Sequence, residues 1–177
     1  MVKRYTQTTY ETCLACSLLQ AVNKTNPITI DQKTELEVIN HSLRFSKDDF
    51  VSGHLDFIVK RFNVKIRRIV DNKLFLNYIN KVKTSDKIKN EVAKVNLNLI
   101  DDLLKEVQPI VYIDAYLLFG VYHAPHFITI LEKVNDKYKI FDTWDGIEKL
   151  IEAETLSKAI SSLRDYLKFA PQVIVIN

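Results

Sequence analysis

Apolar residues recur with helical spacing along much of the first 107 residues. In residues 13–23, CLACSLLQAVN, they fall nearly all round the helical wheel, which predicts a helix buried on most sides. Thr12 stands directly before this segment and is a suitable N-cap. Further helices are predicted over residues 31–43, 47–62 and 99–107, the last capped by Asn98. The expected inward residues are Leu36, Ile39 and Leu43 in the second helix, and Phe50, Leu55, Ile58, Val59 and Phe62 in the third.

Short apolar and β-branched runs replace the helical pattern from Pro109 onward. Strands are predicted over residues 64–70, 110–113, 126–131, 138–141 and 173–176, with a helix over 154–168, while 73–96 is expected to be partly helical. Asn135-Asp136-Lys137 is a hairpin turn signal. Helices first and an antiparallel sheet second predict an α+β fold with a helical N-terminal half and a C-terminal antiparallel sheet. A length of 177 residues predicts one domain over residues 1–177.

Composition narrows the function classes. The net charge of +3, from 25 basic and 22 acidic residues, is too small to indicate a nucleic-acid partner. No stretch approaches the ~18 apolar residues that a membrane span needs, and no apolar region follows the basic N-terminus as in a secretory signal. Two cysteines three positions apart do not make a disulfide framework. We therefore expect a reducing, cytoplasmic location.

Cys13 lies at the expected first turn of the buried helix. A helix N-terminus carries partial positive charge and free N–H groups, which favour a thiolate over a thiol and can stabilise an oxyanion. The plain alternative is a cysteine that packs in the core. Gln7, six residues earlier in the polar segment TQTT, has a side-chain amide that can donate a second hydrogen bond to an oxyanion.

His126 opens a predicted strand, and Asp142 follows the next one. A histidine at the start of a buried strand is held rigidly and suits proton transfer near neutral pH. If the hairpin loop has three residues, 134–136, then 128 lies opposite 142, and Asp142 is the diagonal neighbour of His126 on the same face. A shift of one residue would put Asp142 on the other face, so Asp145 is the second candidate.

Together Cys13, His126 and Asp142 follow the nucleophile, base and orienter pattern of covalent acyl transfer. His123 and Trp144 flank these residues in sequence and are predicted to line a substrate cleft. This chemistry requires no metal and no organic cofactor.

The chain resembles the papain-like cysteine peptidases, and most closely their C39-like branch. The matching elements are Gln7 five residues ahead of Cys13, the strand Gln108-Pro-Ile-Val-Tyr112, the strand His126-Phe-Ile-Thr-Ile, and Phe141-Asp142-Thr143 after a hairpin. The resemblance implies a papain-like fold and a Cys-His-Asp hydrolase that cleaves a peptide or amide bond through a thioacyl intermediate on Cys13. It also implies that Gln7 stabilises the oxyanion. Leu14 stands where the family often has Gly, and Thr143 where it often has Pro.

Other functions fit parts of the same pattern. The chain could be a catalytically inactive binding protein on the same fold. The same residues could also catalyse acyl transfer or deamidation. Cys13-x-x-Cys16 with His123-x-x-His126 has the spacing of a Cys₂His₂ zinc module, although no Gly or Pro forms a knuckle there. Cys13 and Cys16 could also form a redox pair, but redox Cys-x-x-Cys motifs normally follow a strand in a βαβ unit.

Overall fold

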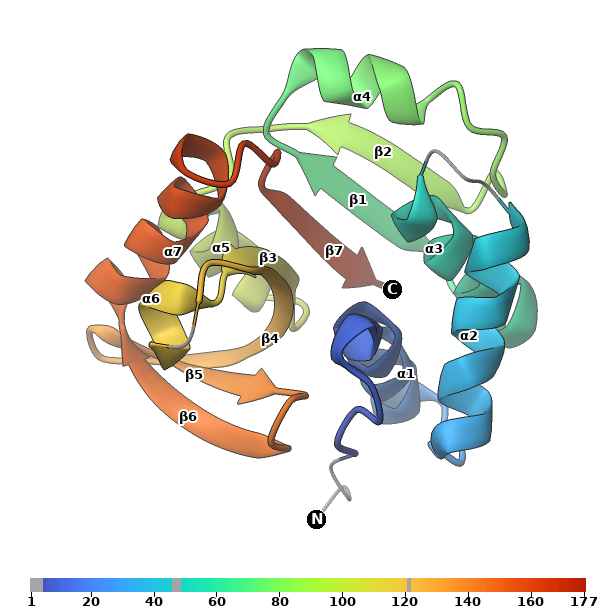
Figure 1. Cartoon of the computed structure of the whole chain (residues 1–177), viewed down its shortest axis with the longest axis horizontal. Coiled ribbons are helices and arrows are strands. Elements are labelled where there is room, and N and C mark those ends of the chain that lie inside the picture. The colour runs from blue at the N-terminus through green and yellow to red at the C-terminus, as the bar shows by residue number, and fades with distance from the viewer. Residues whose placement is uncertain (1–4, 46–48, 121) are drawn as a thin grey trace.

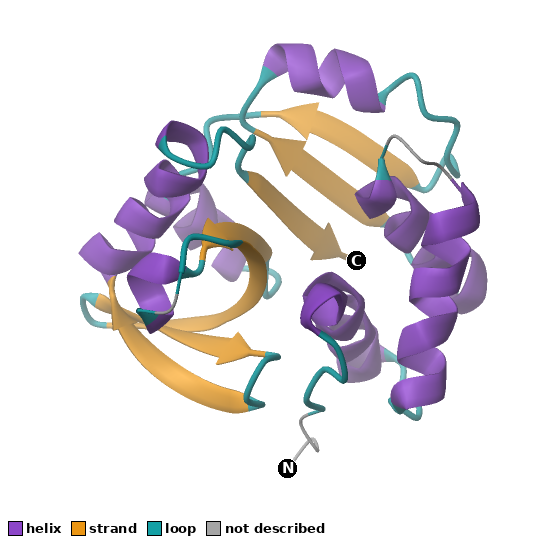
Figure 2. Cartoon of the chain, viewed as in Figure 1, coloured by secondary structure: helices purple, strands orange, loops and turns teal. Residues whose placement is uncertain are grey.

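The computed structural model describes residues 5–45, 49–120 and 122–177, so positions 47 and 48 of the predicted third helix lie outside the described residues, as do residues 1–4. The described chain is a mixed α+β fold, whose helices flank one seven-stranded sheet (Figures 1 and 2). The helices are η1 (Tyr10–Thr12), α1 (Cys13–Thr25), α2 (Gln32–Phe45), α3 (Phe50–Phe62), α4 (Lys73–Ile79), α5 (Leu97–Leu104), α6 (Tyr116–Phe119) and α7 (Ala153–Asp165). The strands are β1 (Ile66–Val70), β2 (Ile88–Val92), β3 (Ile110–Asp114), β4 (Pro125–Val134), β5 (Lys137–Asp142), β6 (Ile147–Glu152) and β7 (Gln172–Ile176).

The sheet runs in the order β2-β1-β7-β3-β4-β5-β6. Its β1–β2 pair is parallel, and the other pairs are antiparallel. The predicted C-terminal antiparallel sheet is present in β3 to β7, but it continues through β1 into the parallel pair β1–β2, which was not predicted. The last strand, β7, makes this connection, because it is buried over residues 172–175 and pairs with β1 on one side and β3 on the other. It thereby joins strands from both halves of the chain into one sheet (Figure 1).

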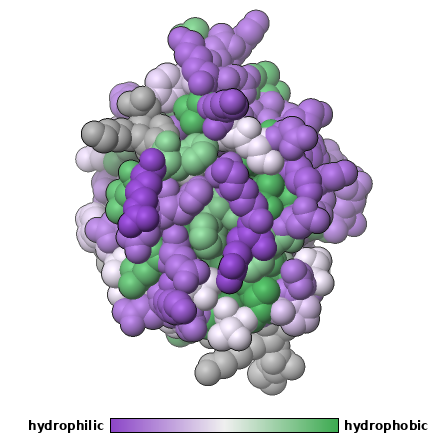
Figure 3. Space-filling model, turned by 90° about the vertical axis from the view of Figure 1, so that its right-hand side faces the viewer, coloured by the Kyte–Doolittle hydropathy of each residue, from purple (hydrophilic) through white to green (hydrophobic). Residues whose placement is uncertain are grey.

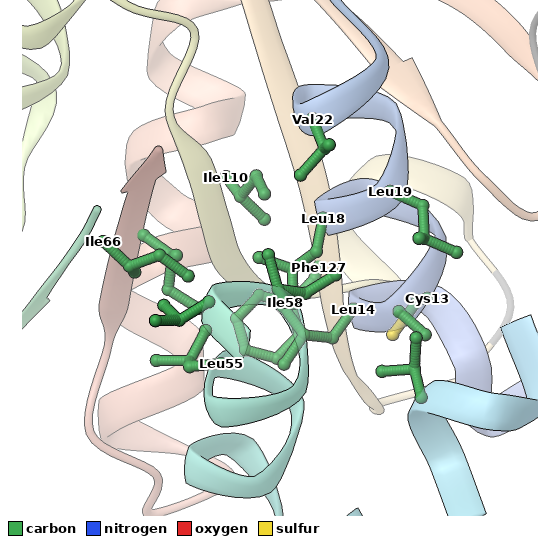
Figure 4. Close-up of a cluster of buried hydrophobic side chains, with 14 of the residues drawn as sticks. Cys13, Leu14, Leu18, Leu19, Val22, Leu55, Ile58, Ile66, Ile110 and Phe127 are labelled. Atoms are coloured by element: carbon green, nitrogen blue, oxygen red, sulfur yellow. The ribbon is translucent and has the colours of Figure 1, made fainter. Parts of the chain in front are cut away.

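Helix α1 occupies the centre of the molecule, between the sheet and the pair α2 and α3 (Figure 1). Every residue from Cys13 to Gln20 is buried, as the apolar pattern predicted. Leu14 and Leu18 pack with Leu55 of α3 and Phe127 of β4 in one core cluster (Figure 4). A helix buried this way has little freedom to shift, so a side chain at its start is held firmly in place.

The inward face of α2 differs from the prediction. Leu36 and Leu43 are 37% and 61% exposed, while Glu35, Val38 and Ser42 are buried. Small residues let α2 approach α3 so closely that a Cβ added to Gly53 would lie 2.6 Å from the Cα of Ser42. The face of the molecule shown in Figure 3 is mostly hydrophilic, with separate apolar patches.

Several boundaries also differ from the predictions. Strand β6 was not predicted, and the ambiguous stretch 73–96 contains both α4 and β2. Helix α5 begins at Leu97 with Asn96 as its cap, not Asn98, because the Asn96 side chain accepts a hydrogen bond from the N–H of Leu99. None of the helices in the described ranges is long and apolar enough to cross a membrane.

Candidate active site

Cys13 is the first residue of α1 and is 8% exposed. The 3₁₀ turn η1 runs directly into α1, so Thr12 does not cap the helix through its side chain as predicted. Its hydroxyl instead donates to the carbonyl of Thr9 at 2.8 Å. Figure 4 places Cys13 at the end of α1, beside the apolar core.

His126 is the second residue of β4 and is fully buried. Its Nε2 lies 2.9 Å from Oδ1 of Asp142, the last residue of β5. The indole ring of Trp144 covers the imidazole, with ring centroids 4.1 Å apart, and the ring of Phe119 meets it edge to face at 5.9 Å. The imidazole is thus held by one carboxylate and two aromatic rings.

The pairing of β4 and β5 brings Asp142 to His126. The predicted three-residue loop is wrong, because Val134 pairs with Lys137 across a two-residue turn. A β-bulge between Ile130 and Glu132 then shifts the register by one residue, so that Thr129 pairs with Phe141. Continuing this register puts Ile128 opposite Asp142, the alignment that the sequence predicted. The bulge therefore compensates for the shorter turn, and Asp142 rather than Asp145 meets His126.

The second ring nitrogen of His126, Nδ1, is buried and makes no hydrogen bond of normal geometry to any of the described residues. The Cys13 thiol is nevertheless close enough to interact with the ring. Burial disfavours the protonated imidazole, but the hydrogen bond to Asp142, the charge of that carboxylate and the neighbouring Cys13 sulfur raise the pKa of His126 to about 9. Residues 113 positions apart in the sequence therefore lie together, with the imidazole between a thiol and a carboxylate.

The Asp142 carboxylate has two further hydrogen-bond donors. Its Oδ1 also accepts the backbone N–H of Trp144 at 3.0 Å, and Lys149 Nζ lies 3.2 Å from its Oδ2. Burial by itself would raise the pKa of Asp142, but the hydrogen bond from His126 and these two donors hold it below its usual value. Asp142 is therefore ionised at neutral pH.

Gln7 lies beside the same strand end. Its backbone N–H donates to the carbonyl of Thr143 at 2.9 Å, and its Oε1 accepts the Thr143 hydroxyl at 2.6 Å. Its amide nitrogen donates to the carbonyls of Thr9 and Tyr10, at 2.8 and 3.1 Å. Gln7 thus ties the turn before α1 to β5, and its role as an oxyanion donor stays a prediction.

Two cavities flank this group of residues. One of about 360 Å³ is lined by Cys13 and by mostly apolar side chains of α1, α3, β3 and β4: Leu14, Phe50, Val51, Tyr112, Pro125 and Phe127, with His54, Tyr10 and Glu11. The other, of about 400 Å³, is lined by Gln7, Thr8, Thr9, Tyr10, Tyr122 and Trp144. Tyr10 borders both cavities, and its ring lies 6.0 Å from that of Tyr122 and 5.3 Å from that of Trp144.

Of the two residues predicted to line a cleft, only Trp144 borders one of these cavities. His123 lies elsewhere: its Nδ1 is 2.6 Å from Oδ2 of Asp114, and its ring stacks on Tyr166 at 3.8 Å. Sequence reasoning did not identify Lys149 or the apolar lining of the cavity beside Cys13. No sequence pattern identifies them, because these residues come from separate elements and meet only in the folded chain.

Cys16 is fully buried one turn beyond Cys13. Burial and the nearby Glu35 carboxylate raise the pKa of its thiol, so Cys16 stays protonated. Within residues 5–45, 49–120 and 122–177, no three His, Cys, Asp or Glu side chains are grouped so as to hold a metal ion. The residues of the suggested zinc module are therefore separated, with Cys16 near Glu35 and His123 on Asp114.

Comparisons with known proteins do not assign this site: no protein-family model matches the chain, and no curated protein matches it.

Proposed function

We propose that this protein is a cysteine peptidase-like hydrolase that cleaves a peptide or amide bond. Cys13 is the nucleophile, His126 the general base and Asp142 the residue that orients the imidazole. One observation carries the proposal: the buried His126 ring lies between the Cys13 thiol and the Asp142 carboxylate. The papain-like resemblance of the sequence motifs supports the same assignment.

The reaction follows from this arrangement. Asp142 accepts a hydrogen bond from Nε2–H of His126, which leaves Nδ1 to take the proton of the Cys13 thiol. The thiolate attacks the carbonyl carbon, a C–S bond forms, and the carbonyl π electrons move to the oxygen. When this oxyanion collapses, the C–N bond breaks and the leaving amine takes the proton from His126. Water, deprotonated by His126, then attacks the thioester, the C–S bond breaks, and the acid leaves.

The cavities suggest how a substrate binds. The cavity beside Cys13 is lined mostly by apolar and aromatic groups, so it suits an apolar side chain of the acyl part of a peptide. The cavity bordered by Trp144 and Tyr122 then accommodates the leaving part on the other side of Tyr10. To stabilise the oxyanion, the Gln7 side-chain amide would have to give up its hydrogen bond to the carbonyl of Thr9 or of Tyr10.

A binding protein without turnover remains the second candidate. The observation in its favour is that both amide hydrogens of Gln7 are already used by the carbonyls of Thr9 and Tyr10. A protein that only binds peptides would keep the two cavities and need neither the thiol nor the imidazole.

Cleavage of a complex peptide mixture tests the proposal. Peptides from a digested proteome, with their amino termini blocked, are incubated with the protein, and new amino termini are counted by mass spectrometry. We expect new termini with the native protein and with His123→Ala, a control that alters a histidine outside both cavities. We expect a loss of more than about 1,000-fold with Cys13→Ala and with His126→Ala. Equal cleavage by native protein and Cys13→Ala, or no cleavage by either, would contradict the hydrolase and favour the binding protein.

A further inference from the structure

Lys149 reaches the candidate active site from β6, at the edge of the sheet. Its partner across the β5–β6 pair is Ile140, two residues before Asp142. The Lys149 side chain is 28% exposed, and its ammonium group lies 3.2 Å from Oδ2 of Asp142 and 2.5 Å from Oδ2 of Asp145. It also lies over the Phe119 ring, 4.4 Å from the centroid. Two carboxylates and an aromatic face thus fix this cation beside the Asp142–His126 pair.

The two oxygens of Asp142 have separate partners. Oδ1 faces Nε2 of His126, and Oδ2 faces Lys149. When His126 is protonated, a single carboxylate therefore lies between two cations. An ammonium group on the far side of a carboxylate weakens the attraction of that carboxylate for a protonated imidazole, because the two cations repel each other.

We propose that Lys149 is a positioning residue that fixes the Asp142 carboxylate and weakens its hold on the His126 proton. The inference rests on the proposed function, in which His126 must both take a proton from Cys13 and release it to the leaving amine. A base whose proton is held too tightly is slow in the second step, so a partly neutralised Asp142 suits both steps.

Among the described residues, Cys13 and Asp145 are further titratable groups near the pair. Cys13 on α1 lies beside His126, and a thiolate at this position favours the protonated imidazole. Asp145, in the turn before β6, faces Lys149 rather than His126 and opposes its charge. Lys149 stays protonated in this setting, because hydrogen bonds and charge interactions with Asp145 and Asp142 outweigh its partial burial and raise its pKa.

Trp144 provides a direct readout of His126. It is the single tryptophan of the chain, and its ring lies 4.1 Å from the imidazole. A protonated imidazole in contact with an indole quenches its fluorescence, so the fluorescence should rise as His126 loses its proton. Tyr10 also packs against Trp144, but burial and a hydrogen bond to Tyr122 raise its pKa, so Tyr10 does not titrate in the same range.

The test is a fluorescence titration from pH 5 to 10.5 of the native protein and the Lys149→Met, Lys149→Arg and Asp145→Asn variants. His126→Ala identifies the step that belongs to His126. We expect a native midpoint near pH 9. Lys149→Met should move it upward by on the order of half to one pH unit. Lys149→Arg should restore the native midpoint, and Asp145→Asn, which leaves the cation in place, should not move it upward.

A Lys149→Met midpoint equal to or below the native one would overturn the proposal, and so would the absence of any His126-dependent step. Near-ultraviolet circular dichroism shows whether each variant keeps the native packing. If Lys149→Met does not keep it, the conservative Lys149→Arg variant is used for the test instead. Iodoacetamide labelling of Cys13 in the same samples separates the two claims. If Cys13 is labelled slowly and at the same rate in His126→Ala, the proposed function is refuted. If Cys13 is labelled fast but the Lys149→Met midpoint equals the native one, only the role of Lys149 is refuted.

Discussion

Two buried histidines show how partners, rather than burial, decide protonation. The pKa of His126 is raised to about 9, and that of His54 is lowered to about 4, although both rings are buried. His126 faces a carboxylate and a thiol. His54 has its Nδ1 2.9 Å from the carbonyl oxygen of Phe50, and its Nε2 has no hydrogen-bond partner among the described residues. Without an anion in contact, desolvation keeps His54 neutral.

The low pKa of His54 predicts that the free energy of unfolding falls in acid, because the unfolded chain takes up a proton at His54 before the folded protein does. A pKa lowered from 6.5 to about 4 on folding contributes stability that is present above pH 6.5 and lost as the pH falls toward 4. Between pH 7 and pH 5 the native protein should therefore lose on the order of 2 kcal/mol that His54→Leu does not lose. Urea unfolding of both proteins at the two pH values measures this. Identical changes in the two proteins would show that His54 is not held neutral in the folded state.

The residues of the candidate site differ in how far the sequence reveals them. Cys13, His126 and Asp142 stand at the starts or ends of apolar segments, a local feature that can be read from the pattern. Lys149 stands in a half-charged segment, IEKLIE, and only the pairing of β6 with β5 brings it to Asp142. His123 shows the opposite error, because its closeness to His126 in sequence does not place it beside either cavity.

At the scale of elements, the strands that were not predicted are the two edges of the sheet. Strands β2 and β6 read IKNEV and IEKLIE, and most of their residues are partly or fully exposed. An edge strand buries less apolar surface than a central one, so its periodicity is weak. The central strands β3, β4, β5 and β7 have longer apolar runs and were predicted within a few residues.

The close contact of α2 with α3 leads to a prediction about Gly53. Alanine favours a helix over glycine by about 1 kcal/mol, yet the added methyl would lie 2.6 Å from the Cα of Ser42. We expect Gly53→Ala to destabilise the protein by about 1–3 kcal/mol, because the two helices must move apart. The thermal unfolding midpoint measures this change. As a control, Gly120→Ala meets no atom within 4 Å and should cost only about 1 kcal/mol for its left-handed backbone. A Gly53→Ala midpoint at or above the native one would contradict the close packing.

At the scale of the whole molecule, the α+β class was predicted, but the single mixed sheet was not. Its order depends on two long-range events: the parallel pairing of β1 with β2 and the entry of the C-terminal strand β7 between β1 and β3. Both join segments that are far apart in sequence, and no local pattern specifies them. The same long-range folding places α1 against β4, and so brings Cys13 to His126.

The pairing of Cys13 with His126 is the central claim, and labelling by iodoacetamide at pH 7 tests it most directly. Mass spectrometry follows Cys13 and Cys16 separately in the native protein, in His126→Ala and in the control His123→Ala. We expect Cys13 to react about 100-fold faster than Cys16 and to slow by about 10-fold or more in His126→Ala alone, because the imidazole takes the thiol proton. Slow labelling of Cys13, at the rate of Cys16 and unchanged by the loss of His126, would contradict the nucleophile–base pair.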